Sequence, residues 1–508
     1  MSNEADMTPQ DPRRYRWAVM LIVIIGTFMA ILDSSIVNVA LPQIMRAFGV
    51  PLDEAKWIVS GYMLAYAVLI PVAGWARDVI GGKFTFLAAM TVFTIGSALC
   101  SLAWSNESLI AFRIIQAIGG GAIMPTGLML ITEAFEPEER GTAIGIWGVG
   151  VVMAPTVGPV IGGILVDLVG WRSIFYINIP IGIGAVLLGK RLLQEGKTVA
   201  KPFDFSGFTA LTIFLVSALW GISEGQSEGW TSPSIMAAGS IAIVALTIFF
   251  RLEFRVPYPL MDMSLFLIPN FSIAALLAVF RSIALFGTVF MLPVLMQNVM
   301  GYTAPAAGLG LAPGAIAIGL AMPVAGRFSD RFGPRIPSFI GVAATALSLY
   351  MFSLLAPDSP YSAILWPMII RGIGIGFLMG PITAAAMNAV PPAKIGMSSG
   401  ILNLFQQVGG AVGIALLELY IQFRALTHGR LLTTAADTED VRPQLEAMGI
   451  LSGDMAGVPT VEVSDMARLA ASHAFNDVFL LTAVIMALGL IPALLLQRGK
   501  PQRLDDTS

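Results

Sequence analysis

The sequence predicts an all-α polytopic membrane protein, built as two parallel six-helix bundles with two further helices inserted between them, fourteen transmembrane helices in all. The first reason is composition: of 508 residues, 56% are hydrophobic and 12% are charged, whereas soluble domains carry about 25% charged residues. The second is length, because fourteen helices of about 20 residues occupy roughly 280 residues. The third is a pair of motifs that recurs half a chain apart.

The same composition excludes several classes of protein. A charge deficit over so long a chain excludes a soluble enzyme, a disordered scaffold and a nucleic-acid binder, and a net charge of -3 attracts no polyanion. The single cysteine, Cys100, forms neither an intramolecular disulfide nor a thiolate metal cluster. Both histidines, His428 and His473, fall in one late polar segment. Carboxylates must therefore carry any proton that crosses the membrane, and we expect no metal and no cofactor.

Apolar stretches separated by polar or Gly/Pro turns predict the individual helices. The spans are expected at residues 17–41, 56–76, 84–104, 107–131, 141–166, 173–193, 207–222, 233–252, 270–297, 304–326, 336–356, 361–388, 398–422 and 475–497. The first is longer than the apolar core of about 7–15 residues in a signal peptide, so we interpret it as an uncleaved span. The seventh is short, and the polar sequence GISEGQSEGW follows it.

Basic residues predict the orientation. With the N-terminus in the cytoplasm, about 19 Lys and Arg residues fall on the inner side and about 7 on the outer side. We therefore expect both termini in the cytoplasm and the protein in the plasma (inner) membrane. The outer loop at about 423–473 is long and polar, with short helical pieces. A disordered linker, a cap over an exit and a contact site for an extracytoplasmic adaptor protein all remain open for it.

Two motifs recur half a chain apart and predict a duplication. One is a Gly-Asp-Gly motif, found at Gly74, Asp78 and Gly81 and again at Gly326, Asp330 and Gly333. The other is an arginine followed by a Gly- and Pro-rich stretch, Arg113 in the fourth span and Arg371 in the twelfth. Each copy lies an even number of spans later, so the halves run parallel. We expect a bundle at 1–200, an inserted pair at 201–260 and a second bundle at 261–508, an architecture typical of secondary transporters.

Asp33 is a carboxylate within the apolar first span. With a rise of 1.5 Å per residue, Asp33 lies within roughly 12 Å of the outer end of its span, and Arg113 lies roughly 9 Å below the outer end of the fourth. The two charges therefore share a depth. Protonation of Asp33 would free Arg113, as a proton-driven switch requires. A static pair that joins two helices is the alternative, and the switch is favoured because intramembrane ions are usually functional.

The fifth span contains two prolines and several glycines. Pro155 and Pro159 remove backbone donors, which predicts a kink. Gly158, Gly162 and Gly163 have the small-x-x-x-small spacing that permits close helix contact.

Polar side chains on the predicted helices indicate a substrate cavity. The candidates are Tyr62, Tyr66, Gln116, Asn403, Gln407, Arg281, Arg371 and Glu418. Asn403, Gln406 and Gln407 belong to one stripe of the thirteenth span, which lipid would not solvate. Helix–helix packing is the alternative for each candidate. Arg281 and Arg371 have no carboxylate at their depth, which argues against obligate dicationic substrates.

Several motifs resemble the major facilitator superfamily, and more narrowly its fourteen-span drug:proton antiporter family. LDSSIVNVALP is similar to a signature of fourteen-span exporters, and GWARDVIGGKF resembles the loop motif between the second and third spans. RIIQAIGGGAIMP resembles the motif with the proton-linked arginine, and APTVGPVIGG resembles the antiporter motif. WRSIFYINIPIG also looks like this exporter family. The resemblance covers nearly the whole chain.

The resemblance implies a major-facilitator-type fold and proton-driven export of lipophilic drugs by alternating access. It implies proton coupling by Asp33 and Arg113 and a cytoplasmic gate built on Gly74, Asp78, Gly81 and Lys83. Val79 follows Asp78, where the family has an arginine, so the latch is expected to be weaker. The implied partners are small lipophilic substrates, protons and the lipid bilayer, with the protein acting as a monomer.

Other functions were weighed against the same residues. A dedicated exporter of one metabolite or lipid on the same fold remains the alternative within transport. A membrane-embedded enzyme is disfavoured because clustered acids or histidines are missing from the spans. The chain has no G-x-x-x-x-G-K-[ST] motif and is therefore not its own ATPase.

Overall fold

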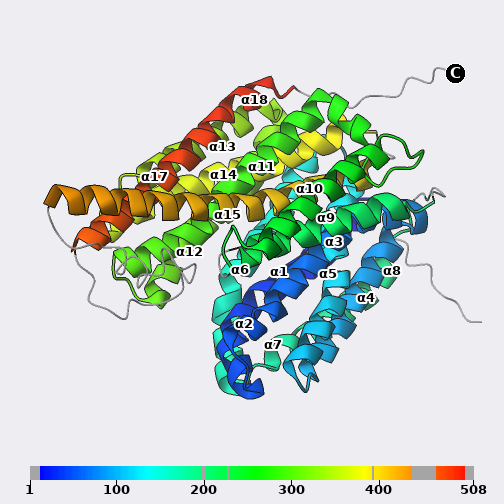
Figure 1. The fold of residues 1–508 in the computed structure, drawn as a ribbon. Coiled ribbons are helices and arrows are strands. Elements are labelled where there is room, and N and C mark those ends of the chain that lie inside the picture. The colour runs from blue at the N-terminus through cyan, green and yellow to red at the C-terminus, as the bar shows by residue number, and fades with distance from the viewer. Residues whose placement is uncertain are drawn as a thin grey trace, which may run out of the picture.

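The computed structural model describes residues 12–196, 198, 202–225, 228–391, 394–436 and 465–497, and this part of the chain is helical without strands. Figure 1 shows the helices running roughly along one direction. Their bounds are α1 Pro12–Phe48, α2 Leu52–Ala55, α3 Trp57–Ile80, α4 Gly82–Ser101, α5 Asn106–Ala134, α6 Arg140–Val169, α7 Ser173–Tyr176, α8 Asn178–Leu192, α9 Phe205–Glu224, α10 Pro233–Glu253, α11 Pro269–Val294, α12 Ala304–Phe332, α13 Arg335–Phe352, α14 Tyr361–Ala389, α15 Ile395–Ala436, α17 Asp465–Leu488 and α18 Leu490–Leu495.

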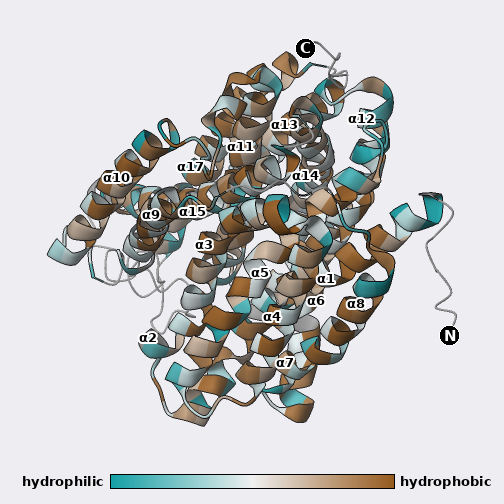
Figure 2. Ribbon diagram, turned by 90° about the vertical axis from the view of Figure 1, so that its right-hand side faces the viewer, coloured by the Kyte–Doolittle hydropathy of each residue, from teal (hydrophilic) through white to brown (hydrophobic). Residues whose placement is uncertain are grey.

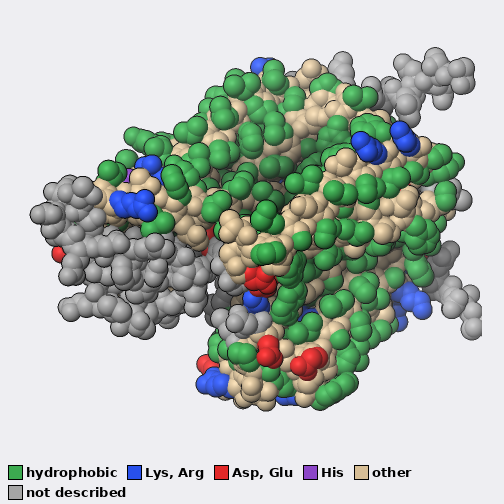
Figure 3. Space-filling view, in the orientation of Figure 1, with side chains coloured by type: hydrophobic (Ala, Val, Ile, Leu, Met, Phe, Trp, Pro, Cys, Tyr) green, Lys and Arg blue, Asp and Glu red, His purple; other side chains and the backbone are tan. Residues whose placement is uncertain are grey.

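Thirteen of the described helical segments are long and apolar enough to cross a membrane, so the all-α polytopic class is confirmed. The remaining long helix, α6, has 30 residues, a length of about 45 Å at 1.5 Å per residue. The fourteen-span count requires α6 to cross as well and stays a prediction. Hydrophobic residues predominate along the helices (Figure 2), and charged side chains are sparse on the face seen in Figure 3.

The long helices form two bundles with a hairpin beside them. Helices α1, α3, α4, α5, α6 and α8 pack together as the N-terminal bundle, and α11 to α15 pack with α17 as the C-terminal bundle. The inserted helices α9 and α10 pack on each other, and α9 rests on α3. Between the bundles the main contacts are α6 with α12 and α3 with α15. The internal repeat relates these two contacts to each other. Helix α3 corresponds to α12 and helix α6 to α15, so the contact of α3 with α15 corresponds to the contact of α12 with α6.

Several helices are longer in the structure than in the sequence interpretation. Helix α1 continues through Pro42 to Phe48, whereas the first span was expected at residues 17–41. The outer loop expected at about 423–473 is shorter, because α15 continues to Ala436 and α17 begins at Asp465. Residues 437–464 of that loop lie outside the described residues.

Polar contacts explain the extension of α15 and α17. Asp477 of α17 accepts hydrogen bonds from Nε of Arg424 at 2.6 Å and pairs with Nε2 of His428 at 2.7 Å. Arg424 and His428, which are one helical turn apart on α15, thus contact the same carboxylate. These pairs supply polar partners to a stretch whose composition had suggested a loop.

The start of α5 positions the residues of the functional site. Ser105 caps this helix, because its hydroxyl accepts from the backbone N–H of Ser108 and the Ser108 hydroxyl accepts from the N–H of Ser105. A reciprocal cap of this kind fixes where a helix begins. It therefore fixes the height of Arg113, which lies two turns further along.

Helices α4 and α5 pack at backbone distance near this point. A Cβ atom built on Gly96 of α4 would lie 2.5 Å from Cα of Gln116, whereas one built on Gly184 of α8 would meet nothing within 4 Å. Gly96→Ala should therefore lower the apparent melting temperature of the detergent-purified protein by several degrees, since overpacking costs about 1–3 kcal/mol.

Gly184→Ala is the matched control, since alanine is the better helix former and this site has room. It should leave the melting temperature unchanged or slightly raised. Equal melting temperatures for the two variants would show that α4 and α5 are not in close contact.

Candidate functional site

A buried ion pair joins α1 to α5. Nη1 of Arg113 lies 2.5 Å from Oδ2 of Asp33, and the two side chains are 1% and 0% exposed. The structure thus brings together the two charges that the sequence placed at one depth. Removing one partner of a buried pair leaves an uncompensated charge, a change that costs about 3–5 kcal/mol.

Two amides complete the surroundings of the carboxylate. Oδ1 of Asp33 accepts from Nε2 of Gln116 at 2.9 Å and from Nδ2 of Asn178 at 2.8 Å. Nη1 of Arg113 also donates to Oε1 of Gln116 at 2.7 Å. Every group directed at Asp33 is a donor, which is the arrangement that an ionised carboxylate needs.

Aromatic and backbone groups hold the guanidinium in place. Cζ of Arg113 lies 3.9 Å from the centroid of the Tyr62 ring, a cation–π contact. Nε of Arg113 donates to the carbonyl oxygen of Ile58 at 3.4 Å. Helices α1, α3, α5 and α8 therefore all contribute to one network around Asp33.

Sequence reasoning missed one member of this network. Asn178 opens α8, where it also donates to Oγ of Ser97 on α4 at 3.0 Å. It lies within the quoted sequence WRSIFYINIPIG, where it received no role. The available signal was an amide in an apolar run, the same signal that selected Gln116.

Two cavity candidates belong to this network instead. Gln116 was expected to face a substrate cavity, but it is 0% exposed and bound to both charges. Tyr62 was expected there too, but its ring is buried beneath Arg113. Tyr66 lies beside Tyr62, with ring centroids 6.0 Å apart, and its hydroxyl contacts Sδ of Met124.

Helix α6 packs on α1 next to Asp33. A Cβ atom on Gly158 would overlap Oγ of Ser35, and one on Gly162 would lie 2.5 Å from Cγ1 of Ile36. Gly163 was expected to share this contact, but its Cβ position meets nothing within 4 Å. Gly163 is one residue, or about 100°, further round the helix and so faces away from α1.

The prolines of α6 do not interrupt it. The helix is continuous from Arg140 to Val169 across Pro155, whose side chain is exposed. The side chain of Pro159 lies outside the described residues. The predicted kink stays a prediction.

The Gly-Asp-Gly motifs lie where the two bundles meet, at one end of the molecule. We call this the closed end; it contains the junctions α3–α4, α5–α6, α12–α13 and α14–α15. A Cβ atom on Gly74 would lie 3.2 Å from the carbonyl oxygen of Gly396, and one on Gly326 would overlap the carbonyl oxygen of Gly141. The first glycine of each motif thus lets α3 cross α15, or α12 cross α6, at backbone distance.

The aspartate of the second motif caps a helix of the other bundle. Oδ1 of Asp330 accepts from the backbone N–H of Gly141 at 2.9 Å, and Oδ2 accepts from that of Thr142 at 2.8 Å. A carboxylate at a helix N-terminus satisfies free N–H groups and favours the helix dipole. Nearby, Nη1 of Arg140 donates to Oδ1 of Asn388 at 2.7 Å.

The first motif is held by a different set of charges. Asp78 pairs with Nη1 of the preceding Arg77 at 2.8 Å, and Arg77 also pairs with Glu133 at the end of α5. Gly81 has φ +93°, which suits glycine, and ends α3. Lys83, which the family resemblance assigned to the gate, forms no ion pair with any described residue of this motif.

The segment before α11 is tied to the closed end as well. Oδ2 of Asp262 accepts from Nζ of Lys394 at 2.6 Å, just before α15 begins. Burial alone would raise the pKa of the Asp262 carboxyl, but hydrogen bonds from Lys394 and Ser264 hold this pKa below its usual value.

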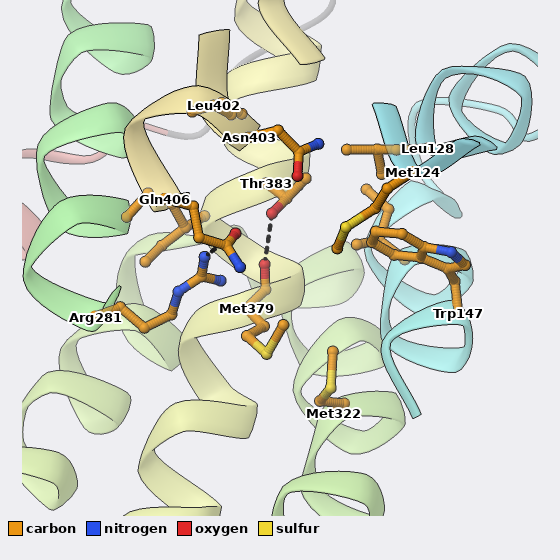
Figure 4. A pocket seen from close by; sticks show the side chains of 13 residues that line it. Met124, Leu128, Trp147, Arg281, Met322, Met379, Thr383, Leu402, Asn403 and Gln406 are labelled. Carbon is orange, nitrogen blue, oxygen red and sulfur yellow. Dashed lines mark hydrogen bonds between the residues drawn. The ribbon is translucent and has the colours of Figure 1, made fainter. Parts of the chain in front are cut away.

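A small cavity lies between the two bundles, next to the closed end. Figure 4 shows methionines and Trp147 on its walls, with Arg281 and Gln406 on one side. Its lining residues are Met124, Leu128, Ile144, Trp147, Ala278, Arg281, Met322, Met379, Ile382, Thr383, Leu402, Asn403 and Gln406. Both bundles thus contribute to the cavity, and its apolar walls carry a few polar groups, as ligand sites do.

Some predicted cavity residues line this space and others do not. Asn403 and Arg281 do, and Nη2 of Arg281 donates to Oε1 of Gln406 at 2.7 Å. Gln407 does not, because its neighbour Gln406 occupies the facing side of α15. Arg371 and Glu418 are buried in the C-terminal bundle away from the cavity.

Asp330→Asn should loosen the closed end. An amide has only one acceptor atom, so at least one backbone N–H of α6 loses its partner, and the population with separated ends should rise about tenfold. Spin labels on cysteines at the exposed positions Glu138 and Arg335 would report the separation by pulsed electron resonance. Cys100 is buried and should not be labelled.

Asp358→Asn, in the turn after α13 at the opposite end, is the control and should leave the distance distribution unchanged. An unaltered distribution for Asp330→Asn would mean that the cap does not hold the two bundles together.

Comparison with known proteins places this arrangement in a family. The model of the Major Facilitator Superfamily matches residues 23–414. The chain is 33% identical over 427 residues to the uncharacterized MFS-type transporter YhcA of Bacillus subtilis, covering 83% of this chain and 80% of YhcA. It is 35% identical over 395 residues to the multidrug resistance protein Stp of Mycobacterium tuberculosis, covering 77% and 73%. It is 29% identical over 478 residues to the multidrug export protein EmrB of Escherichia coli, covering 92% and 93%.

Solved structures share the fold. The proton:xylose symporter XylE matches with a TM-score of 0.60 at 13% identity, covering 94% of this chain and 96% of XylE. A bacterial homolog of the human lysosomal transporter Spinster matches with a TM-score of 0.52 at 18% identity, covering 95% and 96%. On the family match and these relatives, the chain belongs to the major facilitator superfamily.

Proposed function

We propose that this protein exports lipophilic compounds from the cell by alternating access, in exchange for protons. The carrying observation is the ion pair of Asp33 and Arg113, a charged acid held by donors alone inside a membrane helix. The relatives named as multidrug exporters support the class of substrate. The proton gradient supplies the energy, and no cofactor is needed.

The closed end is assigned to the cytoplasm. Helix α1 begins there with Arg13, Arg14 and Arg16, and α8 ends there with Lys190 and Arg191. Basic residues flank membrane helices on the cytoplasmic side. Both termini are then cytoplasmic. Among the described residues, the hydrogen bonds between the bundles lie toward this end, which corresponds to a conformation closed to the cytoplasm.

Helix α6 supplies the route from proton to gate. Its outer part touches α1 at Ser35 and Ile36, beside Asp33, and its first turn is capped by Asp330 of the other bundle. Protonation of Asp33 removes the charge that Arg113, Gln116 and Asn178 hold in place. Helices α1 and α5 are then free to shift, and α6 moves with α1. Coupling between two sites requires an element with two discrete arrangements whose equilibrium both sites influence. We assign this role to α6, with Asp33 near one end and Asp330 at the other.

The cavity suits small lipophilic substrates that arrive from the bilayer. Met124, Met322 and Met379 line it, and methionine adapts to ligands of different shape. A single chain contains both bundles and the cavity, so the monomer is the proposed functional unit. An extracytoplasmic adaptor protein is proposed as a partner on the outer side of the membrane.

Asp33→Asn should abolish uphill export while leaving substrate binding in place, because an amide resembles the protonated acid and cannot release a proton. The measurement is efflux of cationic, neutral and anionic lipophilic dyes from proteoliposomes under an imposed pH gradient. Rates should fall to those of protein-free vesicles.

Asp167→Asn, an exposed carboxylate near the outer end of α6, is the matched control and should export normally. Export at the unmodified rate by Asp33→Asn would remove Asp33 from proton coupling.

Arg113→Ala should also lose uphill export, since the ionised Asp33 then has no cation with which to re-form an ion pair after each cycle. Exchange of substrate down its own gradient should survive. Arg113→Lys keeps the charge but not the planar fork that contacts Asp33 and Gln116 together, so partial export is expected. Dye efflux with and without the pH gradient separates the two activities; full uphill export by Arg113→Ala would leave the pair with a structural role only.

A further inference from the structure

The C-terminal bundle buries two guanidinium groups that lack carboxylate partners. Arg281 is 3% exposed and Arg371 is 2% exposed, comparable to Arg113 at 1%. Unlike Arg113, neither forms an ion pair with any residue that the structure describes. Burying an unpaired charge costs free energy, so a compensating interaction is expected for each of these arginines.

Arg281 faces the cavity with most of its donors unused. A guanidinium has five N–H donors, and the described chain offers Arg281 one acceptor, the Gln406 amide oxygen at 2.7 Å. Its Nε is buried without a partner. In Figure 4 the guanidinium lies next to Gln406 at the cavity wall, and none of the described residues that line the cavity is an Asp or Glu that would neutralise it.

The opposite walls of the cavity are apolar. Met124 and Trp147 come from the N-terminal bundle, and Met322 and Met379 from the C-terminal bundle. An inorganic anion would satisfy the charge but leave these walls without contacts. A lipophilic cation would satisfy the walls but would meet an unshielded positive charge at low dielectric.

We propose that the cavity selects lipophilic anions, molecules with an apolar body and one carboxylate, sulfonate or phosphate group that pairs with Arg281. The planar fork of arginine matches such groups in a bidentate manner. Gln406 positions the guanidinium, and the methionines and Trp147 contact the apolar body. This inference rests on the proposed function, because it takes the cavity as the substrate site.

A pair of fluorescent probes that differ only in the anionic group provides the test. They are 8-anilinonaphthalene-1-sulfonate and N-phenyl-1-naphthylamine, which has the same rings without the sulfonate. Binding of each to the full chain in phosphatidylcholine nanodiscs is measured against empty nanodiscs. We expect the chain to bind the sulfonate more tightly, by about tenfold or more, since charged hydrogen bonds exceed neutral ones by that order.

Variants assign the selectivity to one side chain. Arg281→Gln should weaken binding of the sulfonate by about tenfold or more and leave N-phenyl-1-naphthylamine unchanged, which also verifies folding. Arg281→Lys should retain most of the preference for the sulfonate. Arg371→Gln is the matched control: it removes an equally buried arginine of the same bundle that does not line the cavity, and it should change neither affinity substantially.

Three results would overturn the inference: equal affinity of the unmodified chain for the two probes, equal weakening of both by Arg281→Gln, or the same loss with Arg371→Gln. These results are independent of export, because binding is measured without a gradient. Gradient-driven efflux of neutral or cationic dyes together with no preference for the sulfonate would refute this inference and leave the proposed function intact. Sulfonate selectivity without efflux of any dye would do the reverse.

Discussion

The ion pair between Asp33 and Arg113 constrains most of the N-terminal bundle. Two charges inside a membrane protein are tolerable only if each is paired and its remaining hydrogen-bonding capacity is filled. That requirement brings Gln116 of the same helix, Asn178 of α8 and the Tyr62 ring of α3 to one place. The helices that carry them must approach closely, and the glycines of α4 and α6 permit it, at Gly96 against α5 and at Gly158 and Gly162 against α1. Glycine placement here follows from the location of the charges.

The closed end solves a different physical problem. The two bundles must adhere there and must also separate during a transport cycle. Backbone crossings at Gly74 and Gly326 provide close packing without interlocking side chains. Asp330 adds hydrogen bonds to free N–H groups of α6, which water can satisfy when the ends part. Contacts of this kind hold one state without making the other inaccessible.

Hydropathy and motif spacing predict much of this molecule, because length and apolarity determine what crosses a bilayer. All the expected spans correspond to helices, and the depth estimate located Asp33 opposite Arg113. The errors arise where tertiary contacts decide. The helical extension of α15 depends on a neighbour, Asp477 of α17, which pairs across to α15. The packing of α15 against α11 and α14 determines that Gln406, and not Gln407, faces the cavity, and the sequence alone does not specify this packing. Gln116 carried a correct signal, a polar group in a membrane helix, but composition cannot distinguish a ligand contact from a contact with a neighbouring charge.

The internal repeat makes the difference between the bundles informative. Arg113 and Arg371 occupy corresponding positions in α5 and α14, and both are buried. In the N-terminal bundle an acid neutralises the arginine and amides satisfy the acid, so the charge is fully compensated inside the protein. In the C-terminal bundle, none of the described residues is a partner for Nε and Nη1 of Arg371 or for Nε of Arg281 at the cavity. A compensated pair can be switched by one proton, because protonation unbalances it. An uncompensated cation cannot be switched in that way, but it can be completed by a bound anion. The duplication thus provides two copies of one helix framework: the N-terminal copy carries the carboxylate that suits it to proton coupling, and the C-terminal copy carries a cation at the cavity, Arg281, that suits it to recognition of an anion.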